Sequence, residues 1–248
     1  MNRLVIFERE YSKYLPTLQA ITLSDRLRVN HVRNILKLSI GDDIKIVLEN
    51  KGLATGKVIS LNESSLTLNI VEQFSGKEGN IHLIVGLSRP QTCKKVIEHA
   101  TSMGVSSFDF FTGALSEKSY ANAKLFSEKE YEELLHLGIS QSNGLYQTPE
   151  LRVHKHINRE LFQSKNQKYI LSPFTENTFL DENLDFDRPI TLALGSERGF
   201  TSKEVEIFKE LGYKEIKISP SILRVEIATF AALGQLDLLA MKSKKNVI

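Results

Sequence analysis

A strand that passes into a helix through a polar loop framed by glycines constrains this chain most. The apolar run 191–194 has the character of a strand, and Gly195-Ser196-Glu197-Arg198-Gly199 follows it as the loop. Thr201 and Glu204 have the spacing of a capping box, which predicts that a helix begins directly after the loop. In open α/β sheets ligands bind beyond the carboxyl ends of the strands, so we expect a ligand here. A tight turn that binds nothing is the alternative.

Strands and helices alternate from residue 81 onward. Residues 81–87 and 107–111 have the apolar character of buried strands, and 94–103 carries apolar residues at helical spacing. The alternation continues with helices at 127–137 and 202–211 and strands at 169–171, 191–194 and 215–218. This pattern predicts an α/β domain with a mainly parallel sheet.

Short strands dominate the beginning of the chain. We expect them at 3–7, 43–48, 53–59 and 66–71, with turn residues between them. This part is therefore predicted to be a small antiparallel sheet or barrel with one helix. The polar, glycine-containing segment 74–80 is typical of a linker. We expect one domain at 1–73 and a second at 79–248.

Basic residues concentrate on the helix expected after Ser24. At α-helical spacing three cations fall on one face: Arg26, Arg33 and Lys37. Three apolar residues can then turn inward: Leu27, Ile35 and Leu38. Such a stripe contacts phosphates well, but a solvated helix face has the same sequence, and both interpretations stay open.

Composition excludes several classes of protein. Of the 248 residues 41% are hydrophobic, and the formal net charge is only +2. We expect a cytoplasmic protein with no membrane partner, because no window resembles a membrane span or a signal peptide. The single cysteine and six scattered histidines predict no metal site. Common dinucleotide, P-loop and zinc-protease motifs do not occur.

The final helix, expected at 222–240, is apolar on several faces. Such a helix needs cover on more than one side, which its own domain or a second subunit can supply. Arg224 and Glu226 lie at its start, close to the end of the strand at 215–218. Charged residues beside a strand end are candidates for chemistry.

Four segments of the chain, in this order, match motifs of a known family. They are His31-Val32-x-x-Ile35-Leu36-Lys37-x-x-x-Gly41-Asp42, Ser88-Arg89, Gly195-x-Glu197-x-Gly199-Phe200-Thr201-x-x-Glu204 and Ile222-Leu223-Arg224-x-Glu226-x-Ala228. Together they resemble the ribosomal RNA uridine-N3 methyltransferases of the SPOUT superfamily, over essentially the whole chain. The two C-terminal motifs are the more specific ones.

The resemblance implies a fold and an activity. It implies a PUA-like β-barrel domain that binds RNA, followed by an α/β domain whose C-terminal segment forms a trefoil knot. The family is homodimeric and binds S-adenosylmethionine in the knot. The implied reaction methylates N3 of a uridine in small-subunit (16S) ribosomal RNA, and the implied partner is that RNA or the small subunit.

The resemblance also assigns roles by position. The cofactor pocket would comprise Leu171, Ser172, Leu194, Gly195, Glu197, Gly199, Ile218, Ser219, Ile222 and Leu223. Arg224 would stabilise the negative charge on uracil after N3 loses its proton. Glu226 would orient Arg224 or accept that proton, with a purely structural ion pair as the alternative. The candidate RNA-binding cations are Arg3, Arg26, Arg33, Lys37 and Arg89.

The chain departs from the family's motifs at several positions. Ser196 and Arg198 replace the proline and a glycine of G-P-E-G-G. In the C-terminal motif a glycine, an arginine and a threonine are replaced by Ser219, Ser221 and Ile227. The segment 140–144 lacks the acid and the arginine of E-Q-S-x-R. We therefore expect a divergent member. The alternatives are a protein that binds RNA or ribosomal particles with little or no methyl transfer, and a methyltransferase for another RNA nucleotide.

Overall fold

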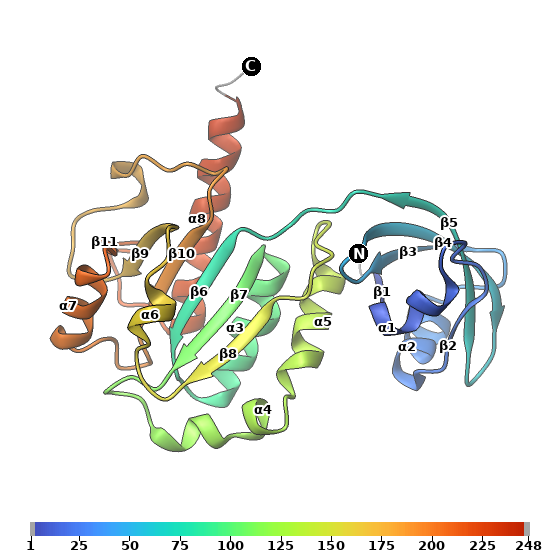
Figure 1. The fold of residues 1–248 in the computed structure, drawn as a ribbon, viewed down its shortest axis with the longest axis horizontal. Coiled ribbons are helices and arrows are strands. Elements are labelled where there is room, and N and C mark those ends of the chain that lie inside the picture. Colours follow the sequence, from blue (N-terminus) through green and yellow to red (C-terminus); the bar gives the residue numbers. More distant parts are fainter. Residues whose placement is uncertain (1–2, 246–248) are drawn as a thin grey trace. The chain divides into compact units, whose positions relative to one another are not determined.

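The computed structural model describes residues 3–245, which divide into two compact units (Figure 1). The first unit comprises Met1–Glu78 and Ile139–Thr148, and the second comprises Gly79–Gly138 and Pro149–Ile248. Segment 139–148 therefore belongs to the first unit, although it follows much of the second in sequence.

A five-stranded sheet in the order β1-β3-β4-β5-β2 forms the first unit. Its strands are β1 (Leu4–Ile6), β2 (Ile21–Leu23), β3 (Asp43–Leu48), β4 (Gly52–Leu61) and β5 (Leu66–Phe74). The antiparallel pairing of β3, β4 and β5 confirms most of the predicted small sheet, whereas β1 pairs with β3 in parallel, unlike the antiparallel sheet that was expected. Two register shifts between β4 and β5 mark bulges that bend the sheet. Strand β2, which has three residues, was not expected.

Short helices close the core of the first unit. They are α1 (Glu8–Tyr11), the 3-10 helix η1 (Ser12–Tyr14), α2 (Arg26–Asn30) and the π-helical turn η2 (His31–Ile35). Asp25 caps α2, because its carboxylate accepts a hydrogen bond from the Arg28 amide at 2.8 Å. Val29 and Val32 are buried against the apolar face of the sheet.

The predicted basic helix is wrong in its length and in the direction of its apolar residues. It converts into η2 at His31 and ends at Ile35, so Lys37 lies beyond it, with a φ of +53°. A π turn contains an extra residue, so α-helical spacing no longer relates positions on either side of it. Leu27 and Ile35, which were expected to face inward, are 77% and 66% exposed, whereas Leu38 packs against the core.

The second unit contains a six-stranded, fully parallel sheet in the order β11-β9-β10-β6-β7-β8. Its strands are β6 (Ile81–Gly86), β7 (Val105–Phe111), β8 (Glu150–His154), β9 (Gln167–Leu171), β10 (Ile190–Leu194) and β11 (Lys214–Ile216). The predicted parallel sheet is therefore confirmed. Strand β8 was not expected, because it lies at an edge and its residues are mostly half-buried or exposed.

Helices cover both faces of this sheet. They are α3 (Pro90–Ser102), α4 (Lys124–Ser127), α5 (Tyr131–Gln141), α6 (Arg159–Phe162), α7 (Ser202–Glu210) and α8 (Val225–Lys245), with 3-10 helices η3 (Lys118–Asn122) and η4 (Phe179–Asp181). Leu83 and Val85 of β6 pack in one apolar cluster with α3 and α8. Ile84 between them packs in a separate cluster with Phe162 of α6 and Phe208 of α7.

Helix α8 begins at Val225 rather than at Ile222 and continues to Lys245. Its inner residues Ala232, Leu233 and Leu236 are buried in the core of the second unit. Leu238 and Met241 remain 62% and 58% exposed, so apolar residues do occupy more than one face. Within residues 3–245, no helix has the length and apolar character needed to cross a bilayer.

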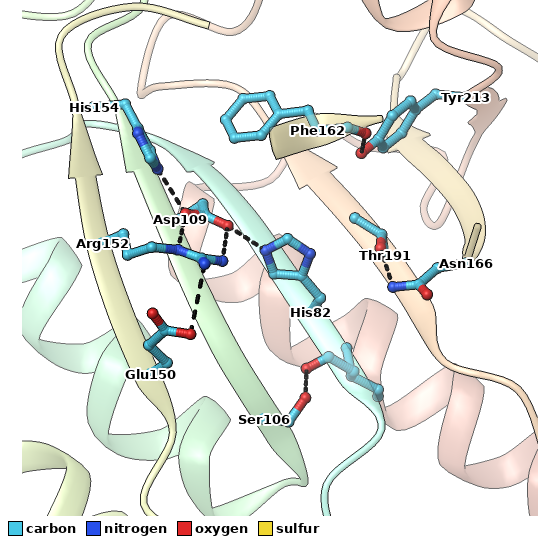
Figure 2. Close-up of polar contacts among 11 residues, drawn as sticks. His82, Ser106, Asp109, Glu150, Arg152, His154, Phe162, Asn166, Thr191 and Tyr213 are labelled. Carbon is cyan, nitrogen blue, oxygen red and sulfur yellow. Dashed lines mark hydrogen bonds and ion pairs between the residues drawn. The ribbon is translucent and has the colours of Figure 1, made fainter. Parts of the chain in front are cut away.

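A buried ion cluster ties β6, β7 and β8 together (Figure 2). The fully buried carboxylate of Asp109 accepts hydrogen bonds from His82 at 2.5 Å and His154 at 2.6 Å. Arg152 donates two more, at 2.8 and 2.9 Å. Burial raises the pKa of this carboxyl, but the hydrogen bonds outweigh burial and hold it well below its ordinary value. The cluster thus links the side chains of three neighbouring strands of the sheet.

Candidate functional site

A cavity of about 300 Å³ opens beyond the carboxyl ends of β9 and β10. Three segments line it: 170–174 after β9, 194–200 after β10, and 218–228 between β11 and the first turn of α8. Strand ends of a parallel sheet are the position at which the sequence predicts a ligand. The structure therefore gives the glycine-framed loop two partner segments and an open cavity between them.

The loop 195–199 closes on itself at its two glycines. A Cβ atom on Gly195 would lie 2.6 Å from the carbonyl carbon of Gly199, so only glycine fits there. Gly199 has a φ of +78°, in the left-handed region, and its amide donates to the Ser196 carbonyl at 2.8 Å. The loop consequently presents main-chain groups to the cavity.

The predicted capping box is present at the start of α7. Glu204 accepts a hydrogen bond from the Thr201 amide at 2.7 Å, and Thr201 accepts one from the Glu204 amide at 3.3 Å. The other carboxylate oxygen of Glu204 accepts from the Ala114 amide at 2.8 Å. This buried glutamate therefore fixes the helix start, and with it the C-terminal side of the loop, to the segment after β7.

Glu197 fixes the loop on its other side. Its carboxylate accepts hydrogen bonds from the Arg89 amide at 3.3 Å and from the Thr92 hydroxyl at 3.5 Å, and the Arg89 guanidinium lies 3.6 Å from it. Arg89 immediately precedes α3. A carboxylate at the first turn of a helix also interacts favourably with the helix dipole. The loop is thus attached to the N-terminus of α3.

Hydrogen bonds also hold the other two walls of the cavity. The Ser172 amide donates to the Ile216 carbonyl at 3.0 Å, which joins the ends of β9 and β11. The side chain of Gln235 donates to the Ile218 carbonyl at 2.8 Å, so α8 holds the third segment. Phe174, at the end of the first segment, is 89% exposed.

All ten candidate cofactor-binding residues line this single cavity. They are Leu171, Ser172, Leu194, Gly195, Glu197, Gly199, Ile218, Ser219, Ile222 and Leu223. Their role stays a prediction, but the structure brings together side chains from three distant parts of the sequence. It adds lining residues that were not predicted individually, among them Pro173, Phe174, Arg198, Ser221 and Ala228. Their position within the same segments is the only sequence signal for them.

Arg224 and Glu226, the candidate catalytic residues, have different surroundings. Arg224 is exposed and lies between the lining residues Leu223 and Val225. Glu226 is buried, and its carboxylate pairs with Lys95 of α3 at 3.4 Å. Among residues 3–245 there is no hydrogen bond or ion pair between Arg224 and Glu226, so the ion pair considered from the sequence is not formed.

Four of the five candidate RNA-binding cations belong to the first unit. Arg26 and Lys37 are exposed, Arg33 lies 3.4 Å from Glu63, and the Arg3 amide donates to the Ser140 carbonyl. The π turn prevents Arg26, Arg33 and Lys37 from forming one α-helical stripe. Arg89 lies in the second unit beside the cavity. None of these positions tests RNA binding, which stays a prediction.

Arg28, in the same basic segment, has a structural role. Its guanidinium binds Glu10 at 2.6 Å and packs over the ring of Phe7 at 4.7 Å. Desolvation of Arg28 lowers its pKa, but the hydrogen bonds that it donates to Glu10 and the charge of that carboxylate outweigh desolvation and raise the pKa. A sequence cannot separate such a cation from its exposed neighbours, because the partner Glu10 comes from another helix.

The chemistry of the cavity suits a nucleoside. Most lining residues are apolar, and the remainder are serines, glycines and one pair of charged residues. An apolar wall accommodates a flat base, while main-chain and hydroxyl groups hydrogen-bond its edges and sugar. Among the described residues no group of His, Cys, Asp and Glu is arranged to hold a metal ion.

Two family models match the chain. Residues 76–237 match an RNA methyltransferase domain, and residues 25–71 match an RNA methyltransferase PUA domain. The first model covers the sheet of the second unit and all three segments of the cavity. The second covers the basic segment and most of the small sheet.

Named relatives resemble the chain over most of its length. Ribosomal RNA small subunit methyltransferase E 1 of Borreliella burgdorferi is 27% identical over 246 residues, which is 94% of this chain and 95% of the relative. Ribosomal RNA small subunit methyltransferase E of Treponema pallidum is 29% identical over 83% of this chain and 80% of its own.

Solved structures have the same fold. Ribosomal RNA small subunit methyltransferase E from Neisseria gonorrhoeae, bound to S-adenosyl methionine, superposes with a TM-score of 0.80 at 21% identity, over 96% of this chain and 98% of that one. A Legionella pneumophila protein in complex with the same cofactor gives 0.77 at 20% identity, over 96% and 98%. The expected fold class, an α/β SPOUT-type domain after a small PUA-like domain, is confirmed, whereas the knot itself stays a prediction.

Proposed function

The chain belongs to the RNA methyltransferase domain family, and we propose that it methylates N3 of a uridine in the 16S RNA of the small ribosomal subunit. One observation carries the proposal: the cavity at the strand ends gathers all ten residues that the resemblance assigns to S-adenosylmethionine. The names of the relatives from Borreliella and Treponema support the ribosomal substrate. The uridine and its N3 atom come from the resemblance alone.

S-adenosylmethionine, when bound, supplies an activated methyl group. The apolar residues Leu171, Leu194 and Leu223 would contact the adenine, and main-chain groups of the loop 195–199 would hydrogen-bond the ligand. Gly195 keeps this loop closed and Glu197 keeps it attached to α3. The cavity is thereby shaped before the ligand arrives, which lowers the entropic cost of binding.

Arg224 is the proposed electrostatic catalyst. N3 of uridine is a poor nucleophile until its proton leaves, and the resulting negative charge spreads onto the neighbouring carbonyl oxygens. The guanidinium of Arg224 is exposed beside the cavity and has no partner among the described residues, so it is free to meet this charge. A preorganised cation at such a position stabilises the transition state by about 3 kcal/mol.

Glu226 is the proposed proton acceptor. Its carboxylate is buried and near the start of α8, and Lys95 is its partner at 3.4 Å. Because Glu226 pairs with Lys95, it does not pair with Arg224, and its carboxylate is held in position. Glu226 lies outside the cavity lining, so the proton of N3 would pass to it through a water molecule.

The first unit is proposed to bind the RNA, with the second unit holding the reaction site. The exposed Arg26 and Lys37 in the first unit, and Arg89 in the second, supply positive charge for phosphates. Arg3 and Arg33 are the further candidates. In this proposal the PUA-like domain covers 1–73 and the methyltransferase domain 79–248, and the protein works in the cytoplasm.

A homodimer is the proposed assembly. Apolar side chains of α8 and of the cavity rim are exposed in the single chain: Phe174, Ile222, Ile227, Leu238 and Met241. Exposed apolar residues in this number around one helix are typical of a protein interface. Phe174 and Ile222 line the cavity, so an interface that includes them would lie beside the reaction site.

Methyl transfer to purified small subunits tests the function. The protein is incubated with labelled S-adenosylmethionine and, separately, small subunits, free 16S RNA and transfer RNA, and the modified base is mapped. Label at N3 of one uridine of 16S RNA is expected. Label at another nucleotide would establish the alternative target. Calorimetry that detects no S-adenosylmethionine binding would leave the alternative of an RNA-binding protein without methyl transfer.

A further inference from the structure

We propose that Arg198 is the anion-binding residue of the cavity and that it binds the carboxylate of the cofactor's methionine moiety. This inference rests on the proposed function. The family motif that the loop resembles has a glycine at this position, so the motif assigns no role to the side chain. The structure places Arg198 among the residues that line the cavity.

The backbone on both sides of Arg198 is fixed. It lies within a turn closed by the hydrogen bond from the Gly199 amide to the Ser196 carbonyl, at 2.8 Å. The Ser196 hydroxyl also donates to the Gly199 carbonyl at 3.4 Å. Ser196 is buried, whereas Arg198 is exposed. The turn therefore presents the arginine from a rigid base, and little backbone freedom is lost when a ligand binds.

The guanidinium of Arg198 has no hydrogen bond or ion pair with any residue of 3–245. The other charged lining residue, Glu197, is already neutralised by Arg89 and hydrogen-bonded to Thr92. Every remaining lining residue is uncharged. The cavity wall thus carries one unbalanced positive charge, and an anionic group on the ligand would balance it.

The cofactor offers one anion, the methionine carboxylate. Its adenine and ribose are neutral, and its sulfonium and ammonium groups are cationic and repelled by a guanidinium. Arginine presents parallel N–H donors that match the two oxygens of a carboxylate. Arg198 is accordingly expected to select ligands that retain the methionine tail over those that lack it.

An RNA phosphate is the other anion that Arg198 could meet, since the chemistry of recognition is shared. The two sources differ in what they predict. A carboxylate partner makes Arg198 matter for binding of the small ligand without RNA. A phosphate partner makes it matter only for binding of RNA, with a dependence on salt concentration.

Calorimetry with two ligands separates these cases. S-adenosylhomocysteine carries the carboxylate, and methylthioadenosine shares its adenosine and sulfur but lacks the carboxylate. Arg198→Ala should weaken binding of S-adenosylhomocysteine about tenfold and leave methylthioadenosine unchanged. Arg198→Lys should recover part of the loss. Lys203→Ala, which removes an exposed cation outside the lining, should affect neither ligand.

Three results would overturn the proposal. Equal weakening of both ligands by Arg198→Ala would mean that the loop has been disturbed rather than an anion site removed. Unchanged binding of both ligands together with weaker, more salt-sensitive RNA binding would identify a phosphate partner. Failure of the unaltered protein to bind either ligand would remove the cofactor assignment itself. If binding is selective but no RNA is methylated, the proposed function fails and the role of Arg198 stands.

Discussion

The carboxylate of Glu197 accepts a hydrogen bond from the backbone amide of Arg89 at 3.3 Å, across a separation of 108 residues in the sequence. This bond joins the loop after β10 to the first turn of α3. Both residues occur in motifs that carry the resemblance to the methyltransferase family. Their pairing gives a physical reason for a glutamate in the loop, because the acid positions the main chain that lines the cavity.

Replacing Glu197 is therefore expected to loosen the cavity. Glu197→Ala removes the partner of the Arg89 amide and of the Thr92 hydroxyl, so the loop gains freedom that ligand binding must remove. We expect S-adenosylhomocysteine to bind about fivefold more weakly in calorimetry. Glu206→Ala, on the exposed side of α7, is the matched control and should bind normally. Normal binding by Glu197→Ala would contradict the positioning role.

Replacement by alanine is expected to have opposite effects at Gly195 and Gly234. In Gly195→Ala the new Cβ would lie 2.6 Å from the Gly199 carbonyl carbon, so the loop must deform, and we expect ligand binding to fall at least about tenfold. In Gly234→Ala the Cβ meets nothing within 4 Å in the single chain, so ligand binding should be unchanged and α8 of the monomer should gain about 0.5–1 kcal/mol. Calorimetry and urea unfolding measure the two effects. Equal behaviour of both variants would show that the close approach is unimportant.

Arg224→Ala should slow methyl transfer without weakening the binding of the cofactor. The guanidinium is proposed to act on charge that develops only during the reaction, so kcat should fall by about 10²–10³ while S-adenosylhomocysteine binds as before. Arg188→Ala removes an exposed cation of the same unit outside the cavity lining and serves as the control. An unchanged kcat in the Arg224→Ala enzyme would eliminate the assigned role.

The ion cluster at Asp109 predicts how stability changes with pH. The pKa of Asp109 is lowered in the folded protein, so its contribution is complete above the ordinary pKa near 3.8 and is lost as the pH falls through the folded pKa. Asp109→Asn should lower the free energy of unfolding at pH 7 by about 3 kcal/mol and flatten its decline in acid. Urea unfolding between neutral and acidic pH measures both. Asp187→Asn, at an exposed position, should change neither.

Sequence patterns predicted the path of the chain from strand β10 through loop 195–199 into α7 well, because the determinants are local. The glycines at 195 and 199 and the pair Thr201 and Glu204 act within a few residues. The structure confirms the capping box, and Gly199 has a positive φ. The parallel sheet also followed from local alternation. All ten candidate cofactor residues line one cavity. Only the resemblance predicted this, because no local pattern connects the three segments.

The failures have the opposite cause. The π turn at 31–35 breaks the α-helical spacing that relates Leu27 to Ile35, and both residues are exposed. A one-residue insertion of this kind leaves no signature in spacing alone. Lys95 was not foreseen as the partner of Glu226, because the contact joins α3 to α8. Long-range pairs depend on packing, which a single sequence does not reveal.

The apolar surface of α8 gives a last prediction, which concerns assembly. Leu238 is 62% exposed in the single chain, so a charge there costs the isolated fold little, whereas a charge buried without a partner in an interface costs several kcal/mol. Leu238→Glu should therefore yield monomers in sedimentation velocity at concentrations where the unaltered protein is dimeric. These monomers should still unfold in a cooperative thermal transition, because the substitution costs the isolated fold little. Val71→Glu replaces a 60% exposed residue of β5 in the first unit and should leave the dimer intact. A dimer that tolerates glutamate at position 238 would place the interface elsewhere, and an unaltered protein that sediments as a monomer would refute the proposed assembly altogether.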